Sequence, residues 1–123
     1  MASAVPRISG FPPVVGRQPR LLILGSMPSE ASLEVSQYYG LPRNAFWAIM
    51  SELCEANGDY ATRCARLLEH GIALWDVLES SVRPGSLDAD IDPASAQPND
   101  FAGFFAAHRR IERIGFNGRK AAE

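Results

Sequence analysis

The sequence predicts a three-layer α/β fold with a central parallel sheet. Three short apolar runs, "RLLILG" (20–25), "GIALWDVL" (71–78) and "IERIGF" (111–116), are separated by segments with helical spacing. Continuous apolar runs of this length are typical of strands buried on both faces of a parallel sheet. Strands that alternate with helices favour helical layers on both faces of one sheet. A chain of 123 residues has room for one such domain.

The first strand follows an irregular N-terminal lead-in. Residues 1–19 are rich in Pro, Gly and Ser and have no hydrophobic period, so the α/β domain is expected to occupy 20–123. After the strand at 20–25 comes a connection of about twenty residues, which is long for a compact domain. This connection holds two tyrosines and an asparagine, and it is therefore expected to be functional.

Two helices are predicted before the second strand. Asn44 stands at an N-cap position, and Phe46, Met50, Leu53 and Cys54 follow with helical spacing. The tripeptide "NGD" (57–59) ends this helix, and Asp59 is expected to cap the next one, which closes at Gly71.

The rest of the chain repeats the pattern of strand, long loop, helix and strand. The second strand is predicted over 71–78, and the polar stretch 79–98 is expected to be a loop. Asn99 is expected to cap a third helix that places Phe101, Phe104, Phe105 and His108 on one face. The third strand covers 111–116, and "NGRKAAE" (117–123) is typical of a turn that enters a helix.

Composition and charge exclude several classes of protein. The net charge of −2 argues against bulk electrostatic attraction to nucleic acid or to an anionic membrane, although a local basic face remains compatible with it. No run has transmembrane length and no signal-peptide pattern occurs, so a cytoplasmic protein is expected. The two cysteines, Cys54 and Cys64, fit apolar helix positions and are expected to be reduced core residues. We expect neither a metal ion nor a cofactor.

The candidate site lies at the carboxyl ends of the predicted strands. Ligands of parallel sheets bind at this edge, and the informative segments follow Gly25, Asp76 and Phe116. The segment "GSMPS" (25–29) is not a nucleophile elbow, and the sequence has neither a P-loop nor a dinucleotide fingerprint. His70 and His108 each suit a structural position better than a catalytic one.

Neutral polar and aromatic residues dominate this predicted edge. Stacking and hydrogen bonds to a polar rim are how proteins bind flat heterocycles. Asn44 and Asn117 offer donors and acceptors, and the side chains available for stacking are those of Tyr38, Tyr39, Phe46 and Trp47. An alternative interpretation makes the aromatic residues core and the asparagines caps, and for Phe46 and Trp47 it is the stronger one.

The sequence resembles the hypoxanthine-DNA glycosylases, a branch of the uracil-DNA glycosylase superfamily. The resemblance spans residues 20–122 and rests on "GSMPS", "QYYGLPRNAFW", "GIALWDVLESSVRPGSLDADI" and "IGFNGRKA" in that order. It implies a uracil-DNA glycosylase-like αβα sandwich. It also implies that the last strand of the fold and a second, DNA-gripping motif are missing from this chain, so the domain is expected to be incomplete at its C-terminus.

The resemblance implies a role for several residues. The backbone of Gly25, Ser26, Met27 and Pro28 is expected to face the departing base, and Asn44 is expected to be the catalytic residue that orients water. Tyr39 would stack on the extruded base and Asp76 would contact its edge. Further candidates for contact with DNA or base are Arg43, Phe46 and Asn117. Leu41 departs from the family pattern, in which a His usually precedes the Pro.

The implied function is removal of a deaminated base from DNA, with hypoxanthine as the first candidate. The implied enzyme is monofunctional, because Lys120 is the only lysine that could supply an amine. We expect a monomer for a complete chain and DNA as its partner. Two alternatives stay open: a uracil- or mismatch-specific DNA glycosylase, and a catalytically inactive DNA-binding fragment.

Overall fold

The computed structural model describes residues 7–40, 45–83 and 91–117. Its central sheet is parallel, with strand order β3-β2-β6. The three strands are β2 (Leu21–Gly25), β3 (Ile72–Asp76) and β6 (Arg113–Phe116). Gly25 pairs with Asp76 at the last rung between β2 and β3, so the ends of these strands lie side by side. The parallel sheet predicted from the three apolar runs is therefore confirmed.

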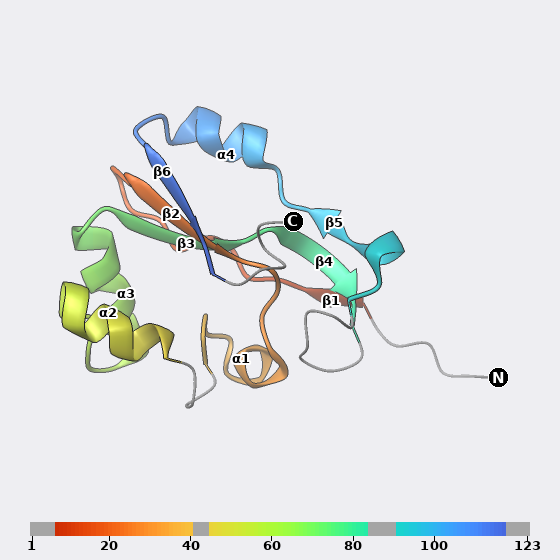
Figure 1. The fold of residues 1–123 in the computed structure, drawn as a ribbon, viewed down its shortest axis with the longest axis horizontal. Helices are drawn as coiled ribbons and strands as arrows, with labels where there is room; N and C mark the ends of the chain where they lie inside the picture. The colour runs from red at the N-terminus through yellow and green to blue at the C-terminus, as the bar shows by residue number, and fades with distance from the viewer. Residues whose placement is uncertain (1–6, 41–44, 84–90, 118–123) are drawn as a thin grey trace.

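Helices cover both faces of this sheet, because the strands carry apolar side chains on both faces. Helices α2 (Phe46–Cys54) and α3 (Tyr60–Glu69) lie on one side and α4 (Phe101–Ala107) on the other (Figure 1). Successive strand residues point to opposite faces. Leu74 belongs to the core under α2 and α3, whereas its neighbours Ala73 and Trp75 belong to the core under α4. The three-layer arrangement is thus the expected αβα sandwich.

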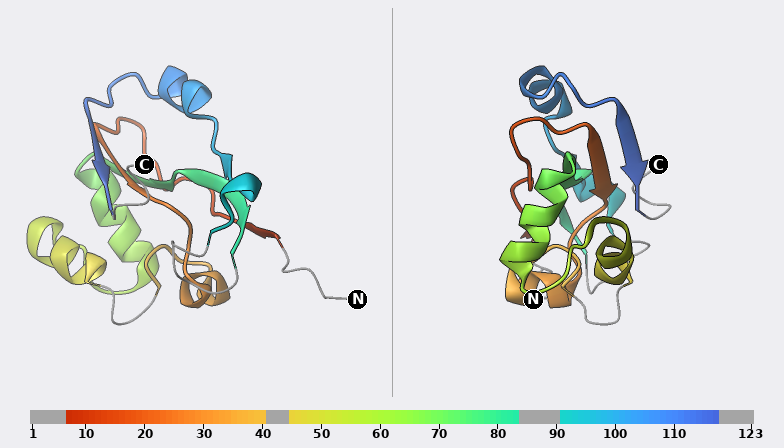
Figure 2. Two further views of the ribbon diagram at one scale, coloured as in Figure 1. Left: turned by 45° about the vertical axis from the view of Figure 1, so that its right-hand side comes forward. Right: turned by 90° about the vertical axis from the view of Figure 1, so that its left-hand side faces the viewer.

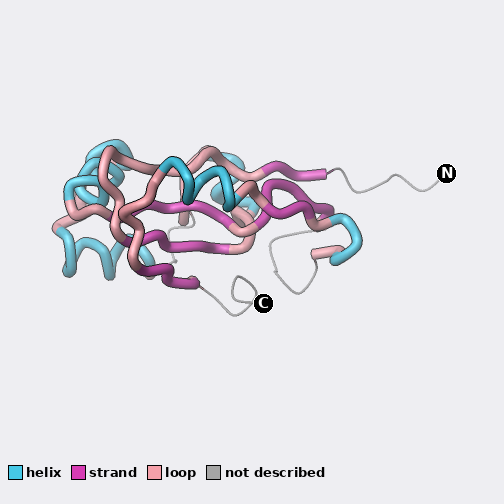
Figure 3. The backbone as a smooth tube through the Cα atoms, turned by 90° about the horizontal axis from the view of Figure 1, so that it is seen from above, coloured by secondary structure: helices cyan, strands magenta, loops and turns pink. Residues whose placement is uncertain are grey.

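A second, antiparallel sheet corrects two sequence predictions. Its order is β1-β4-β5, made by β1 (Arg7–Ser9), β4 (Leu78–Val82) and β5 (Gln97–Pro98). It lies beyond the carboxyl end of β3 (Figures 2 and 3). The described part of the N-terminal lead-in is therefore not wholly irregular, and the polar stretch after residue 78 begins as a strand. A short 3-10 helix (Pro93–Ser95) precedes β5.

The long connection after β2 contains a helix that the sequence analysis missed. Helix α1 (Glu30–Val35) begins at Ser29, whose hydroxyl accepts a hydrogen bond from the amide of Ser32. Six residues are too few for a helix that is stable alone, so α1 depends on its cap and on tertiary contacts. The predicted start of α2 was also wrong, because Ala45 rather than Asn44 occupies its N-cap position. Leu53 is 70% exposed and does not belong to the predicted apolar face.

The remaining helix ends follow ordinary capping chemistry. Asp59 caps α3 by accepting from the amide of Thr62, as predicted, and Gly71 follows with φ of 72°. His70 ends α3 in a structural role, with its Nδ1 2.9 Å from the Arg66 carbonyl. The cap of α4 is Asp100 rather than Asn99. Among the described residues, no helix has both the length and the apolar character needed to cross a membrane.

Candidate active site

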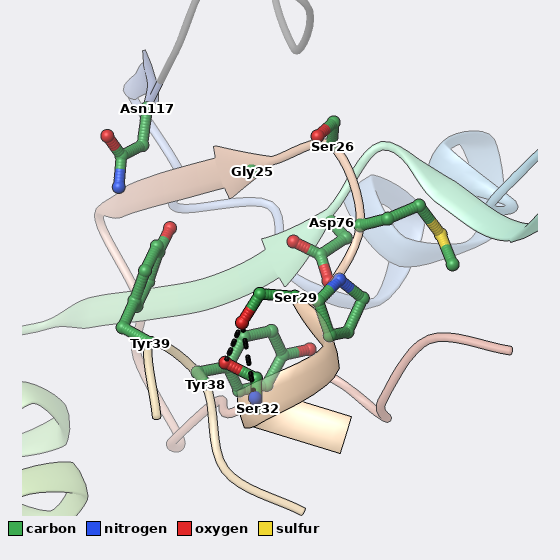
Figure 4. A pocket seen from close by; sticks show the side chains of 10 residues that line it. Gly25, Ser26, Ser29, Ser32, Tyr38, Tyr39, Asp76 and Asn117 are labelled. Atoms are coloured by element: carbon green, nitrogen blue, oxygen red, sulfur yellow. Dashed lines mark hydrogen bonds between the residues drawn. The ribbon is translucent and has the colours of Figure 1, made fainter. Parts of the chain in front are cut away.

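A pocket of about 210 Å³ lies at the carboxyl edge of the parallel sheet. We call it the edge pocket, and it is lined by Gly25, Ser26, Met27, Pro28, Ser29, Ser32, Tyr38, Tyr39, Asp76 and Asn117 (Figure 4). It brings together the ends of β2, β3 and β6, as the position of the informative segments predicted. The volume is below the range of about 300–1,000 Å³ usual for drug-sized ligands, so the edge pocket suits a small group.

The Gly25–Pro28 segment is held through its carbonyl oxygens. The amides of Val77 and Leu78 donate to the carbonyls of Gly25 and Ser26, with N–O distances of 2.7 and 3.2 Å. In a trans peptide the N–H points opposite to the C=O. The N–H groups of Ser26 and Met27, two residues that line the edge pocket, therefore point away from the amides of Val77 and Leu78.

Arg83 holds the last residue of the same segment. Its guanidinium is almost completely buried, and Nη2 donates to the carbonyl oxygen of Pro28. A hydrogen bond from a charged donor is stronger than a neutral one, particularly when it is shielded from water. No sequence signal marked Arg83, because it follows the polar residues of β4 in what was predicted to be a loop.

Gly25 is required by the space around it. A Cβ atom at this position would lie 2.7 Å from Oδ1 of Asp76 and 3.4 Å from the hydroxyl of Tyr39. The first distance is shorter than any ordinary contact, so a side chain would displace the Asp76 carboxylate. The absence of a side chain at Gly25 thus lets the end of β2, the acid and the tyrosine meet in one place.

Asp76 supplies a carboxylate to the edge pocket from the end of β3. Its side chain is buried and lines the edge pocket (Figure 4). The backbone carbonyl of Asp76 accepts a hydrogen bond of 2.7 Å from Nδ2 of Asn99. Asn99, which the sequence analysis interpreted as a helix cap, instead fixes the strand end that carries the acid.

Tyr39 forms one wall of the edge pocket in a strained backbone conformation. Its φ is +54°, in the left-handed region, which costs an L-residue about 1–2 kcal/mol. Its ring stacks on Phe46, with 3.9 Å between centroids and 22° between planes. Phe46 does not line the pocket itself but supports the ring that does. The side chain of Asn117 points toward the Tyr39 hydroxyl (Figure 4).

Two of the predicted site residues lie outside the described part of the chain. These are Asn44 and Arg43, and Leu41 lies there too. The structure brings together all the other predicted base-binding residues and Asn117. It adds Ser29, Ser32 and Tyr38 to the lining, together with Arg83 and Asn99 behind it. Within residues 7–40, 45–83 and 91–117, no cluster of side chains could hold a metal ion.

Burial keeps the tyrosines around the site protonated well above neutral pH. Desolvation raises the pKa of Tyr39 to about 12 and that of Tyr60 to about 12, and it also raises the pKa of Tyr38 above its usual value. A hydrogen bond to Asn117 partly opposes the shift of Tyr39. The phenol of Tyr39 is therefore a neutral group that can donate a proton in a hydrogen bond across the physiological range.

These raised pKa values predict a loss of stability in alkali. Tyrosines of the unfolded chain lose their protons near pH 10, while the native chain keeps them until about pH 12. The native state then binds more protons than the unfolded state, so the free energy of unfolding should fall as the pH rises through this interval. Urea unfolding at several pH values between about 8 and 11 measures this slope. Tyr60→Phe should make it shallower, and a slope near zero in the parent protein would contradict the prediction.

Comparison with known proteins gives a consistent set of relatives. No family profile matches the chain. The chain is 38% identical to a hypoxanthine DNA glycosylase of Methanosarcina acetivorans and 33% identical to one of Methanosarcina barkeri, each over 117 residues. Each alignment covers 93% of this chain and 73% of the relative.

A solved structure has the same fold. It is a solution NMR structure from Methanosarcina acetivorans, provisionally described as a uracil DNA glycosylase. The TM-score is 0.82 with 36% sequence identity, and the match covers 94% of this chain and 73% of that one. The uracil-DNA glycosylase-like fold implied by the sequence motifs is therefore confirmed.

Proposed function

This chain belongs to the family of the hypoxanthine-DNA glycosylases, and from that premise we propose that it excises hypoxanthine from DNA by receiving the extruded base in the edge pocket. A DNA glycosylase cuts the bond between a base and its deoxyribose and thereby starts DNA repair. Because the target atom is inaccessible inside a duplex, the base must leave the stack before the reaction.

The observation that carries the proposal is the carboxylate of Asp76 inside the edge pocket. An ionised carboxylate only accepts hydrogen bonds. Hypoxanthine presents an N1–H donor to such a group, whereas the N1 atom of adenine presents a lone pair. A site built to bind a donor discriminates against an analogue that presents a lone pair at the same position. A carboxylate of Asp76 that meets the N1 position of the base would therefore favour the deaminated base over adenine.

Tyr39 fits the role of stacking partner for this base. Its ring lines the edge pocket and is supported from behind by the ring of Phe46. Stacking of a base on an aromatic side chain contributes about 1–3 kcal/mol to binding. The flat face of this aromatic ring suits a purine ring placed parallel to it.

The proposed reaction is hydrolysis at C1′ of the sugar. The bond from C1′ to the base nitrogen breaks with its electron pair leaving on the base, and a water oxygen bonds to C1′ and gives up a proton to solvent. The N–H groups of Ser26 and Met27 would stabilise the negative charge that develops on the base. Asn44 would orient the water. We propose a monomer that works without a metal ion, since every group named belongs to one chain and none needs a metal.

Uracil is the second candidate substrate. The structural neighbour from Methanosarcina acetivorans is provisionally described as a uracil DNA glycosylase. The N3–H of uracil would satisfy the Asp76 carboxylate as the N1–H of hypoxanthine does, so this acid does not separate the two bases. The size of the pocket and the position of Tyr39 would then decide between a purine and a pyrimidine.

Single-turnover release from a panel of matched duplexes tests the proposal. The duplexes carry hypoxanthine, uracil, adenine or cytosine at one position, and free base is quantified by chromatography. We expect the fastest release from hypoxanthine, slower release from uracil, and none from adenine or cytosine. Faster release from uracil would make uracil the main substrate. Binding of the hypoxanthine duplex without release of base would instead favour an inactive binding protein.

A further inference from the structure

Tyr39 adopts a conformation that its own chemistry disfavours. A left-handed backbone at a bulky residue that is not glycine persists only where neighbouring contacts enforce it, and such residues gather at functional sites. The contacts that enforce this conformation therefore indicate the function of Tyr39.

Side chains from three helices hold the backbone on both sides of Tyr39. Before it, the amide of Tyr38 donates to the hydroxyl of Tyr60 at 3.1 Å, and Nε1 of Trp47 donates to the Tyr38 carbonyl at 3.0 Å. After it, the amide of Gly40 donates to the hydroxyl of Ser32 at 2.8 Å. We call the side chains of Tyr60, Trp47 and Ser32 the Tyr39 clamp.

The clamp is itself rigid. The rings of Trp47 and Tyr60 meet edge to face, with 5.9 Å between centroids and 86° between planes. Ser32 is 2% exposed and lies in the packed α1, where its hydroxyl is 3.2 Å from that of Ser29. Gly40 packs so closely that a Cβ there would lie 2.8 Å from a methyl group of Val35. These contacts leave the chain around Tyr39 little freedom to rearrange.

The clamp also links the two halves of the edge pocket. Ser29 follows the Gly25–Pro28 segment directly and caps α1, and Ser32 joins that cap to the amide of Gly40. The base-facing segment and the aromatic wall are therefore connected through one pair of serine hydroxyls (Figure 4).

We propose that Tyr60 and Ser32 are positioning residues for base recognition, which hold the ring of Tyr39 in place before DNA binds. The inference rests on the proposed function of the edge pocket. Groups that are already ordered in the free protein do not have to be ordered on binding, so a wall fixed in advance increases affinity for the extruded base. Tyr60 does not line the edge pocket, and the hydroxyl of Ser32, which does line it, already accepts from the amide of Gly40.

Two substitutions test the proposal, with a matched control. Tyr60→Phe removes the hydroxyl that holds Tyr38 but keeps the ring that packs on Trp47. Ser32→Ala removes the acceptor for Gly40. The control is Ser51→Ala on α2. The Ser51 hydroxyl accepts a long hydrogen bond of 3.5 Å from the exposed side chain of Asn57, and Ser51 does not line the edge pocket. We expect KM for base release to rise roughly 5- to 30-fold in each test variant. Without the clamp, Tyr39 would relax from its left-handed conformation, and binding would have to restore that conformation at a cost of about 1–2 kcal/mol. The kcat value should change little, because uniform binding is lost.

A double-mutant cycle separates positioning from general stability. Tyr39→Ala removes the ring and should itself raise KM about tenfold or more. If Tyr60 acts through that ring, adding Tyr60→Phe to Tyr39→Ala should change KM no further, so the two losses should be strongly non-additive. Additive losses, or a normal KM in both Tyr60→Phe and Ser32→Ala, would overturn the inference.

A measurement without DNA tests the clamp independently of the proposed function. Amide hydrogen exchange should become faster at Gly40 in Ser32→Ala and at Tyr38 in Tyr60→Phe, with the core amides of β2 unchanged. Unchanged protection at both amides would contradict the clamp. Failure of the unmodified protein to release any deaminated base would refute the proposed function, while faster exchange in the variants would still support the clamp.

Discussion

Gly25→Ala is expected to lower kcat/KM for base release by about 10²-fold or more, the loss that follows when reacting groups move by roughly 1 Å. The new methyl group would lie 2.7 Å from Oδ1 of Asp76 and 3.4 Å from the Tyr39 hydroxyl. The carboxylate must then rotate away from the base edge, and the methyl group takes space inside a pocket of about 210 Å³. Single-turnover kinetics on a hypoxanthine duplex measure the effect.

Gly115→Ala is the matched control for this prediction. Gly115 lies on β6, next to β2 in the same sheet, and a Cβ there would meet a single atom of Ile23 at an ordinary distance of 4.0 Å. It should therefore retain the activity of the unmodified protein. Gly25→Ala should also keep a normal free energy of unfolding in urea, to within about 1 kcal/mol, because only side chains at the pocket must shift. Full activity in Gly25→Ala would show that the base does not occupy this corner.

Asn44→Ala is expected to lower the single-turnover rate of base release by roughly 10²-fold or more, the scale for removing one positioned catalytic group. An amide is a poor base, so its expected role is to orient the attacking water by hydrogen bonds. That role concerns the chemical step alone. Binding to a duplex with an abasic site, measured by fluorescence anisotropy, should therefore change little.

Asn57→Ala provides the comparison for Asn44. Asn57 is exposed between α2 and α3, and its side-chain amide donates to the hydroxyl of Ser51 at 3.5 Å. It should leave both the rate and the binding as they are. Near-normal base release by Asn44→Ala would remove this residue from the mechanism and direct attention to the other polar groups of the edge pocket.

Arg83 offers a physical reason why an acidic chain can still favour a negative charge in its site. The whole sequence carries a net charge of −2, and Asp76 adds a carboxylate to the pocket. The guanidinium of Arg83 lies buried behind the Gly25–Pro28 segment and donates to its last carbonyl. A positive charge at short range in a shielded environment acts more strongly than distant surface charges. Under the proposed function it would contribute locally to stabilising the departing base.

Features that depend on local patterns were predictable from the sequence. The three apolar runs became β2, β3 and β6, because a strand buried on both faces needs apolar residues without interruption. Parallel strands place their carboxyl ends on one edge, so the positions of Gly25, Asp76 and Asn117 followed from the order of the elements. The cap at Asp59 followed from side-chain chemistry within four residues.

Other features were decided by contacts between distant parts of the chain. β4 lacks an apolar run, and it is a strand because Arg7–Ser9 pairs with it from more than seventy residues away. Helix α1 is too short to form alone. The left-handed backbone of Tyr39 is unfavourable locally and exists because side chains of α1, α2 and α3 bind its neighbours. Local sequence encodes the conformational preference of a residue. These conformations are not favoured by local sequence alone, so only the hydrogen bonds and packing of the folded chain could determine them.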